Sequence, residues 1–210
     1  MLTEPATMLT DYAVAVLCAY VSWRLSKTEQ AKTHRSVGFW AAGMGSLALA
    51  SGAGGTVHGW ALILTQPVLW LLWQGALILI GLAGSCFLAG TFAASIALPY
   101  RRLLMTVPIA QLVAYTVWMA THSDFRYAVY NYGGTFALIL LVQLYELFIR
   151  KAPSAAWIVA GVLVSVLAAM VQLSGLTLHP SFNHNDLYHV IQMAGIVLLY
   201  RGAALLHDRR

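Results

Sequence analysis

The segment from Phe182 to Met193 reads FNHNDLYHVIQM and begins the last long apolar run of the chain. Its polar residues recur every three or four positions, which places them on one face of a helix. These residues are Asn185, Asp186, His189 and Gln192. Charged and imidazole side chains inside a membrane helix are costly and turn inward toward partners or water. We therefore expect a functional site here, the alternative being a buried polar stripe that only holds helices together.

The composition of the whole chain indicates an integral membrane protein. Of its 210 residues, 60% are hydrophobic and 9% are charged, whereas soluble domains average about 25% charged residues. The net charge of +5 lies in loops between apolar runs, so we expect no nucleic-acid partner. No basic residue precedes Arg24, which favours a retained first helix over a cleaved signal peptide. Cys18 and Cys86 lie within apolar runs and are expected to be free core residues.

Runs of roughly 20 mostly apolar residues predict membrane helices. Seven such runs occur, at about 10–25, 37–60, 67–98, 102–121, 127–149, 155–178 and 186–205. The third is long enough to be tilted, to extend beyond the bilayer, or to end in a turn near Pro99. There is no convincing internal repeat. The sequence therefore predicts an all-α bundle of seven transmembrane helices forming a single domain, 1–210.

The distribution of lysine and arginine predicts the orientation of this bundle. Of the 12 basic residues, all but Arg126 lie in the loops after the first, third and fifth runs or at the end of the seventh. Cytoplasmic loops carry the excess of such residues. We expect the N-terminus outside, the C-terminus in the cytoplasm, and a multi-pass location in the plasma (inner) membrane.

With this topology, most histidines fall at the outer ends of the runs. His58 ends the second run in the glycine-rich stretch SGAGGTVH, with Ser51 two turns deeper on the same face. The glycines allow close approach of a helix or a ligand, so the stretch is either a site or a packing face. His184 and His189 are five residues apart and cannot both face one ion from a regular helix. His184 could still fold over the site from a non-helical entry near Pro180.

Asp186 shares a face with His189 and could ligate a metal, orient the imidazole, or act as a base. Further polar residues of the outer half are expected to line a pocket with Gln192: Gln74, Tyr115, Tyr130 and Asn131. His122 and Asp124 lie just beyond the fourth run, where a polar outer loop is the simpler interpretation. The inner half is more apolar, which predicts a cavity open to the outside or to the outer leaflet.

Neutral imidazoles and a carboxylate are ligands that Zn²⁺ prefers, and a catalytic zinc keeps one position open for water. Such a metal turns its bound water into a hydroxide that attacks carbonyl groups. The histidine pattern therefore leads to the hypothesis of an intramembrane zinc hydrolase.

The chain resembles the CREST superfamily of seven-helix intramembrane hydrolases, which includes alkaline ceramidases and progestin/adipoQ receptors. His58 has the place of the family's helix-2 histidine, and His189 that of the second histidine of its helix-7 pair. Asn185 replaces the first histidine of the pair, with His184 beside it, and the family's helix-2 serine falls on Gly54, a turn from Ser51. The third run contains no acidic residue to match the family's helix-3 aspartate.

The resemblance implies a zinc-dependent amidase or esterase of lipid metabolism that acts on a membrane lipid. Ceramide-like lipids are the leading substrate class that it implies. It implies His58, His184 and His189 as metal ligands, and Asp186 in place of the missing carboxylate, with Ser51 as a further catalytic residue. Asn185 and Gln192 join Gln74, His122 and Asp124 as secondary pocket residues.

Two other functions fit the same pattern. A non-catalytic receptor, sensor or small-ligand-binding protein would use the polar outer pocket without bringing the histidines to one metal. A haem protein would need histidines deep enough to bury a porphyrin, and these lie near the ends of the runs. A retinal protein is disfavoured because the last run has no lysine for a Schiff base.

Overall fold

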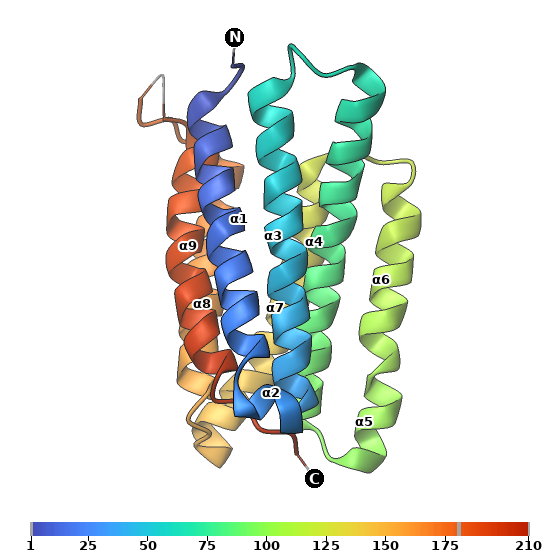
Figure 1. Cartoon of the computed structure of the whole chain (residues 1–210). Coiled ribbons are helices and arrows are strands. Elements are labelled where there is room, and N and C mark those ends of the chain that lie inside the picture. Colours follow the sequence, from blue (N-terminus) through green and yellow to red (C-terminus); the bar gives the residue numbers. More distant parts are fainter. Residues whose placement is uncertain (1, 180–181, 210) are drawn as a thin grey trace.

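The computed structural model describes residues 2–179 and 182–209, and the described chain contains helices and no strand beyond one bridge between His179 and Phe182. The helices are α1 (Pro5–Ser26), α2 (Glu29–Thr33), α3 (Arg35–Trp60), α4 (Gln66–Ser95), α5 (Leu98–Leu104), α6 (Thr106–Met119), α7 (Phe125–Tyr145), η1 (Glu146–Arg150), α8 (Ala155–Ser174) and α9 (His184–Ala203). The long helices run side by side, with the two termini at opposite ends (Figure 1). The predicted all-α fold is confirmed.

Within the described ranges, five helical stretches are long and apolar enough to cross a membrane. They are α1, α4, α5 with α6 (Leu98–Met119), α7 with η1 (Phe125–Arg150), and α8. Helices α3 and α9 are also long, but polar residues and glycines make them less apolar. The protein is therefore a helical membrane protein of several spans, and the count of seven stays a prediction.

Local chemistry explains where the helices end. Helix α1 begins at Pro5, about a turn earlier than predicted, because proline is well tolerated at the first helical position. Helix α4 ends at Ser95, and the chain turns before Pro99, one of the outcomes expected for the long third run. Helix α8 ends at Ser174 rather than near 178 because Gly175 adopts φ 68°, a left-handed cap that glycine accepts without strain.

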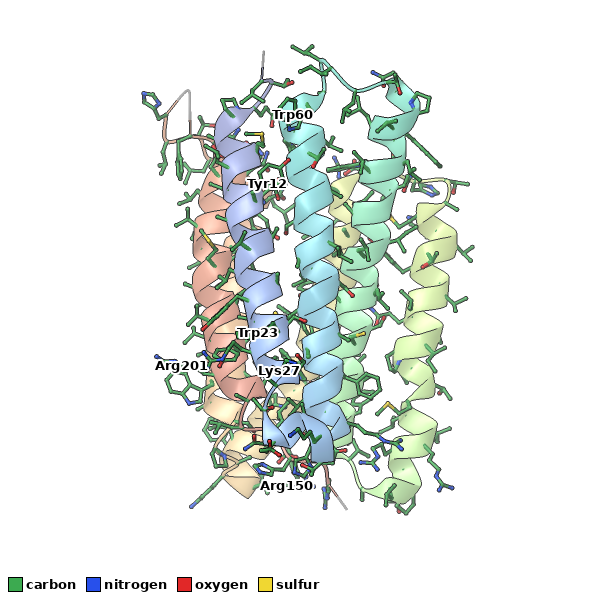
Figure 2. All side chains as sticks on the ribbon, in the orientation of Figure 1. Tyr12, Trp23, Lys27, Trp60, Arg150 and Arg201 are labelled. Carbon is green, nitrogen blue, oxygen red and sulfur yellow. The ribbon has the colours of Figure 1, made fainter. Side chains whose placement is uncertain are left out.

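The C-terminal end of the bundle is filled by apolar side chains. Trp40 and Phe87 are fully buried there with ring centroids 4.6 Å apart, and Leu199 packs in the same cluster. Figure 2 places Lys27, Arg150 and Arg201 toward this end, and Trp60 toward the other. Cys18 and Cys86 are free, as predicted.

Glycines bring neighbouring helices into close contact, as is common where helices pack in membranes. A Cβ added at Gly55 of α3 would lie 2.9 Å from the Cβ of Asp11 and 3.1 Å from the carbonyl oxygen of Met8, both on α1. Gly202 of α9 meets α8 similarly, with 3.0 Å to the carbonyl oxygen of Ser154. At Gly52 of α3 an added Cβ meets nothing within 4 Å. The spacing of α1 and α3 therefore depends on Gly55, and not on every glycine of the stretch.

We expect Gly55→Ala to destabilise the fold by about 1–3 kcal/mol, because the methyl group must push α1 away from α3. Gly52→Ala is the matched control, since it adds the same methyl group into open space and is expected to be neutral or slightly stabilising. Thermal unfolding of both variants in detergent measures the difference. Equal stability of the two variants would contradict this packing.

Candidate functional site

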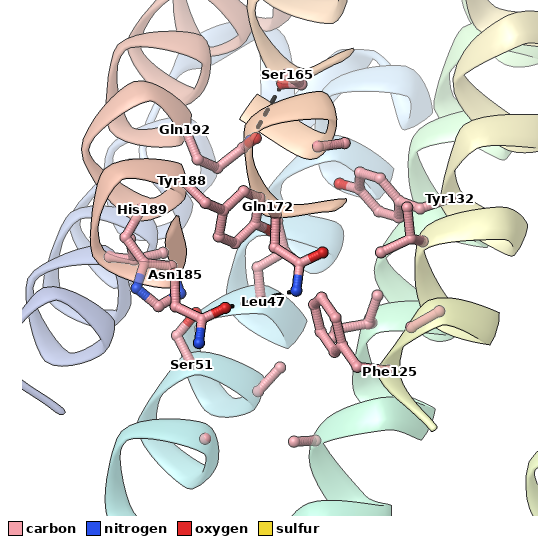
Figure 3. Close-up of a pocket in the computed structure, with 18 of the residues that line it drawn as sticks. Leu47, Ser51, Phe125, Tyr132, Ser165, Gln172, Asn185, Tyr188, His189 and Gln192 are labelled. Carbon is pink, nitrogen blue, oxygen red and sulfur yellow. Dashed lines mark hydrogen bonds between the residues drawn. The ribbon is translucent and has the colours of Figure 1, made fainter. Parts of the chain in front are cut away.

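A cavity of about 650 Å³ occupies the end of the bundle nearer the N-terminus. Its volume lies in the range of small-molecule sites. The lining comes from α1, α3, α4, α7, α8 and α9, and none of the described residues of α2, α5 or α6 contributes. Figure 3 shows side chains from four of these helices around the common space: Leu47, Ser51, Phe125, Tyr132, Ser165, Gln172, Asn185, Tyr188, His189 and Gln192.

A buried carboxylate and a buried imidazole meet at this cavity. Oδ1 of Asp11, on α1, lies 3.2 Å from Nε2 of His189, on α9. The other ring nitrogen, Nδ1, lies 2.9 Å from the hydroxyl oxygen of Thr10. Asp11 and His189 are 6% and 9% exposed, so water satisfies little of either group. Both nitrogens of this ring are therefore engaged, and the contact joins the first and last helices.

The protons of Thr10, His189 and Asp11 can be arranged in two ways. In one, Thr10 donates its hydroxyl proton to Nδ1 of a neutral His189, whose Nε2–H faces the Asp11 carboxylate at 3.2 Å. In the other, Thr10 donates to the carbonyl oxygen of Thr7, 3.0 Å away, and accepts from Nδ1–H. Nε2 and Asp11 then need one further proton between them to avoid opposing lone pairs. The cluster can thus take up one proton without losing a contact.

The polar first residues of the segment from Phe182 to Met193 form the N-terminal cap of α9. The side-chain oxygen of Asn183 accepts the backbone N–H groups of Asn185 at 2.8 Å and Asp186 at 3.4 Å. Oδ2 of Asp186 in turn accepts the N–H of Asn183 at 2.7 Å, which completes a capping box. Oδ1 of Asp186 is buried without a hydrogen-bond partner in the described part of the chain. Asp186 thus has a structural role, with one oxygen left over.

His58 pairs with a carboxylate near the surface. Its Nδ1 lies 2.8 Å from Oε2 of Glu4, and both side chains are partly exposed. The backbone N–H groups of Thr3 and Glu4 donate to the carbonyl oxygens of Gly59 and His58, each at 3.1 Å. The N-terminal segment is thereby fastened across the end of α3 beside the cavity.

All three predicted metal ligands, His58, His184 and His189, line the one cavity. They do not form a metal site as placed, because Thr10 and Asp11 engage His189 while Glu4 engages His58. Across residues 2–179 and 182–209, no group of three or more His, Cys, Asp or Glu side chains is arranged to hold a metal ion. As placed, these side chains therefore do not form the zinc centre that the family resemblance implies.

The remaining predicted residues divide between the cavity and the rest of the bundle. Ser51, Tyr130, Asn185 and Gln192 line the cavity, where Gln192 donates to the hydroxyl of Ser165 at 3.1 Å. The other predicted pocket residues do not line it: Gln74, Tyr115, His122, Asp124 and Asn131.

Each of these residues has local surroundings of its own. His122 stacks on Trp118 at 3.9 Å, and Asp124 caps α7 by accepting the N–H of Arg126. Asn131 accepts from Gln111 at 2.9 Å. Gln74 is buried away from the cavity.

Sequence reasoning missed Asp11, the carboxylate that the structure places against His189. The sequence does mark Asp11, because an ionisable residue inside an apolar run is a functional candidate by default. Tyr132, Tyr188 and Gln172 were also missed. They resemble ordinary aromatic and polar residues of membrane helices, and nothing in their spacing marks them.

The cavity reaches the surface of the bundle between α7 and α8. Several residues that line it are exposed: Tyr130, Gly133 and Gly134 on α7, and Val166, Met170 and Leu173 on α8. A Cβ added at Gly133 or Gly134 meets nothing within 4 Å. The opening therefore faces sideways, along the length of the helices.

Comparison with known proteins identifies a family but no activity. No curated protein and no solved structure matches the chain significantly. Residues 6–208 match the model of a family of unknown function, DUF6962. Since the match spans almost the whole chain, the protein belongs to the DUF6962 family.

Proposed function

We propose that the protein binds an amphipathic small molecule, which enters the cavity sideways from the bilayer between α7 and α8. The observation that carries this proposal is a cavity of about 650 Å³ with a polar end, an apolar body and exposed lining on two adjacent helices. Pockets that bind small molecules combine mostly apolar walls with a few convergent polar groups. Membrane lipids are the natural source of such a ligand.

The shape of the site suggests how the ligand lies. The polar groups Asp11, His58 and His189 belong to the outer end of the cavity. Ile196 lines it about two helical turns, or 10 Å, beyond His189 on α9. Phe136 and Leu47 line the same deeper part from α7 and α3. A polar head beside Asp11 and an apolar tail toward Ile196 would match both regions.

We further propose that α3 and α9 cross the membrane with the other long helices, which gives seven spans. Their support is positional, since α3 packs between α1 and α4, and α9 packs against α1 and α8. The basic residues Lys27, Arg150 and Arg201 lie toward the C-terminal end of the bundle. The positive-inside rule then favours a cytoplasmic C-terminus. In the plasma (inner) membrane, the polar end of the cavity would belong to the outer leaflet.

A zinc-dependent lipid amidase or esterase is the second candidate. It is favoured by one observation, the convergence of His58, His184 and His189 with Ser51 on the same cavity. A ligand-binding site and a hydrolase differ in their metal requirement, which makes the two candidates separable.

Accessibility labelling tests the topology in a Cys18→Ala/Cys86→Ala background. Ser123, before α7, and Tyr100, on α5, are both exposed and lie at opposite ends of the bundle. We expect a membrane-impermeant maleimide to label Ser123→Cys in intact cells and Tyr100→Cys only after lysis. Labelling of Tyr100→Cys alone in intact cells would reverse the orientation.

Sideways entry can be tested by filling the opening. In phosphatidylcholine nanodiscs, tritiated 1-hexadecanol should bind saturably above protein-free discs. We expect the double variant Gly133→Leu/Gly134→Leu to reduce this binding at least fivefold, because the new side chains occupy the gap between α7 and α8.

The matched control is Gly38→Leu/Gly75→Leu, where an added Cβ also meets nothing within 4 Å but neither residue lines the cavity. This control should bind like the wild type. Equal loss in both double variants, or no loss in either, would argue against the opening.

Metal analysis separates the two candidates. If binding is the function, purified wild-type protein should carry no more zinc per chain than His58→Ala and His189→Ala variants, because both rings are occupied by hydrogen-bond partners. About one zinc per chain in the wild type, lost in both variants, would instead favour the hydrolase.

A further inference from the structure

We infer that the ligand is a long-chain amine, whose cationic, proton-donating head lies at the Asp11 end of the cavity. The inference rests on the proposed binding function and names the chemical class that the site selects. It excludes amphiphiles with phosphate or carboxylate heads as preferred ligands.

The formal charges around the cavity carry the first part of the argument. Asp11 lines the cavity, and no lysine or arginine in the described chain does. Asp186, 1% exposed, is a second buried carboxyl group on α9, three residues before His189, and it does not line the cavity. The one basic residue predicted on this side, Arg126, pairs with Asp124 at 3.4 Å and is exposed. A cation entering the cavity meets a favourable potential, while an anion meets an unfavourable one.

Histidine does not reverse this balance. His189 and His58 each already face a carboxylate, Asp11 and Glu4 respectively. His184 also lines the cavity, and its Nδ1 is buried without a partner in the described residues. In its neutral form this nitrogen either accepts or donates. A neutral imidazole can therefore accept a hydrogen bond from a ligand that donates one, whereas an ionised carboxylate requires such a donor.

The unpaired polar atoms point the same way. Within the described ranges, Oε1 of Gln172 and the hydroxyl of Tyr132, both of which line the cavity, are buried without hydrogen-bond partners, as is Oδ1 of Asp186, which does not line it. An amide oxygen and an ionised carboxylate can only accept hydrogen bonds, so these two atoms need donors, whereas the tyrosine hydroxyl can donate or accept. An ammonium group has three donors and no acceptor, whereas phosphate and carboxylate heads are acceptors throughout. Only the former complements these atoms.

Aromatic rings provide a further preference for a cation. Trp73, Phe125, Tyr132 and Tyr188 all line the cavity, and Trp73 lies beside the polar end with its ring centroid 6.1 Å from that of His58. The faces of such rings attract ammonium groups, most strongly where water is excluded. The Asp11 carboxylate, the free acceptor of Gln172 and the aromatic rings thus favour the same class of head group.

Competition among probes of equal chain length tests the inference. Dodecylamine, 1-dodecanol and dodecanoate compete for the bound tritiated 1-hexadecanol in phosphatidylcholine nanodiscs, each expressed as its mole fraction in the disc. We expect dodecylamine to displace the label at a mole fraction at least tenfold lower than dodecanoate. Equal or stronger displacement by dodecanoate would overturn the inference and leave the proposed binding function standing. Failure of 1-hexadecanol itself to bind would instead refute the binding function.

Charge-neutralising variants locate the preference. Asp11→Asn should reduce the preference for amine over carboxylate at least fivefold. Asp124→Asn is the matched control, since it removes an exposed carboxylate that does not line the cavity, and it should keep the preference. An unchanged preference in a folded Asp11→Asn variant would overturn the assignment of the head to Asp11. The wild-type comparison of the three probes stands even if that variant does not fold.

Discussion

The contact between Asp11 and His189 is the constraint on which the N-terminal end of the bundle depends. In apolar surroundings each of these groups needs a partner, because an unpaired buried polar group costs free energy that packing does not return. Their 3.2 Å contact therefore fixes how α1 is rotated against α9. Gly55 allows α1 to approach α3 closely enough for the same carboxylate to stand beside both helices. The first, second and last long helices are thus tied together around the cavity.

The two ends of the bundle differ in packing: one is a closely packed apolar core, and the other encloses the cavity. Toward the C-terminal end, Trp40, Phe87 and Leu199 form a closely packed apolar core that gives the fold its stability. Toward the N-terminal end, the helices enclose a cavity instead, and polar side chains gather at its outer part. A site for an amphipathic molecule needs both parts. The packed core holds the helices that line the cavity in place, and the gap between α7 and α8 leaves the cavity open to the side. The cavity is thereby confined to the half where packing is incomplete.

The sequence predicts the helices well because a membrane span needs a long apolar run, and such runs are visible without knowing their neighbours. Its errors at the ends are local, as at Pro5 and Gly175, where turn chemistry decides the boundary. The site is harder to predict. Of the four residues that spacing placed on one helix face, Asn185, His189 and Gln192 line the cavity, whereas Asp186 caps the helix outside the lining. Partners from other helices leave no local pattern. Thr10 and His189 are 179 residues apart, and only the packing of α1 on α9 makes them neighbours.

Photo-crosslinking tests the binding of an amphiphile in this cavity most directly. The probe is 1-hexadecanol with a diazirine at the end of its tail, and the crosslinked residues are identified by mass spectrometry. A tail inside the cavity should react with its deep lining, at Leu47, Phe136 and Ile196. Crosslinks confined to outward-facing residues such as Val113 and Val117 of α6, which are exposed and do not line the cavity, would contradict the proposed site.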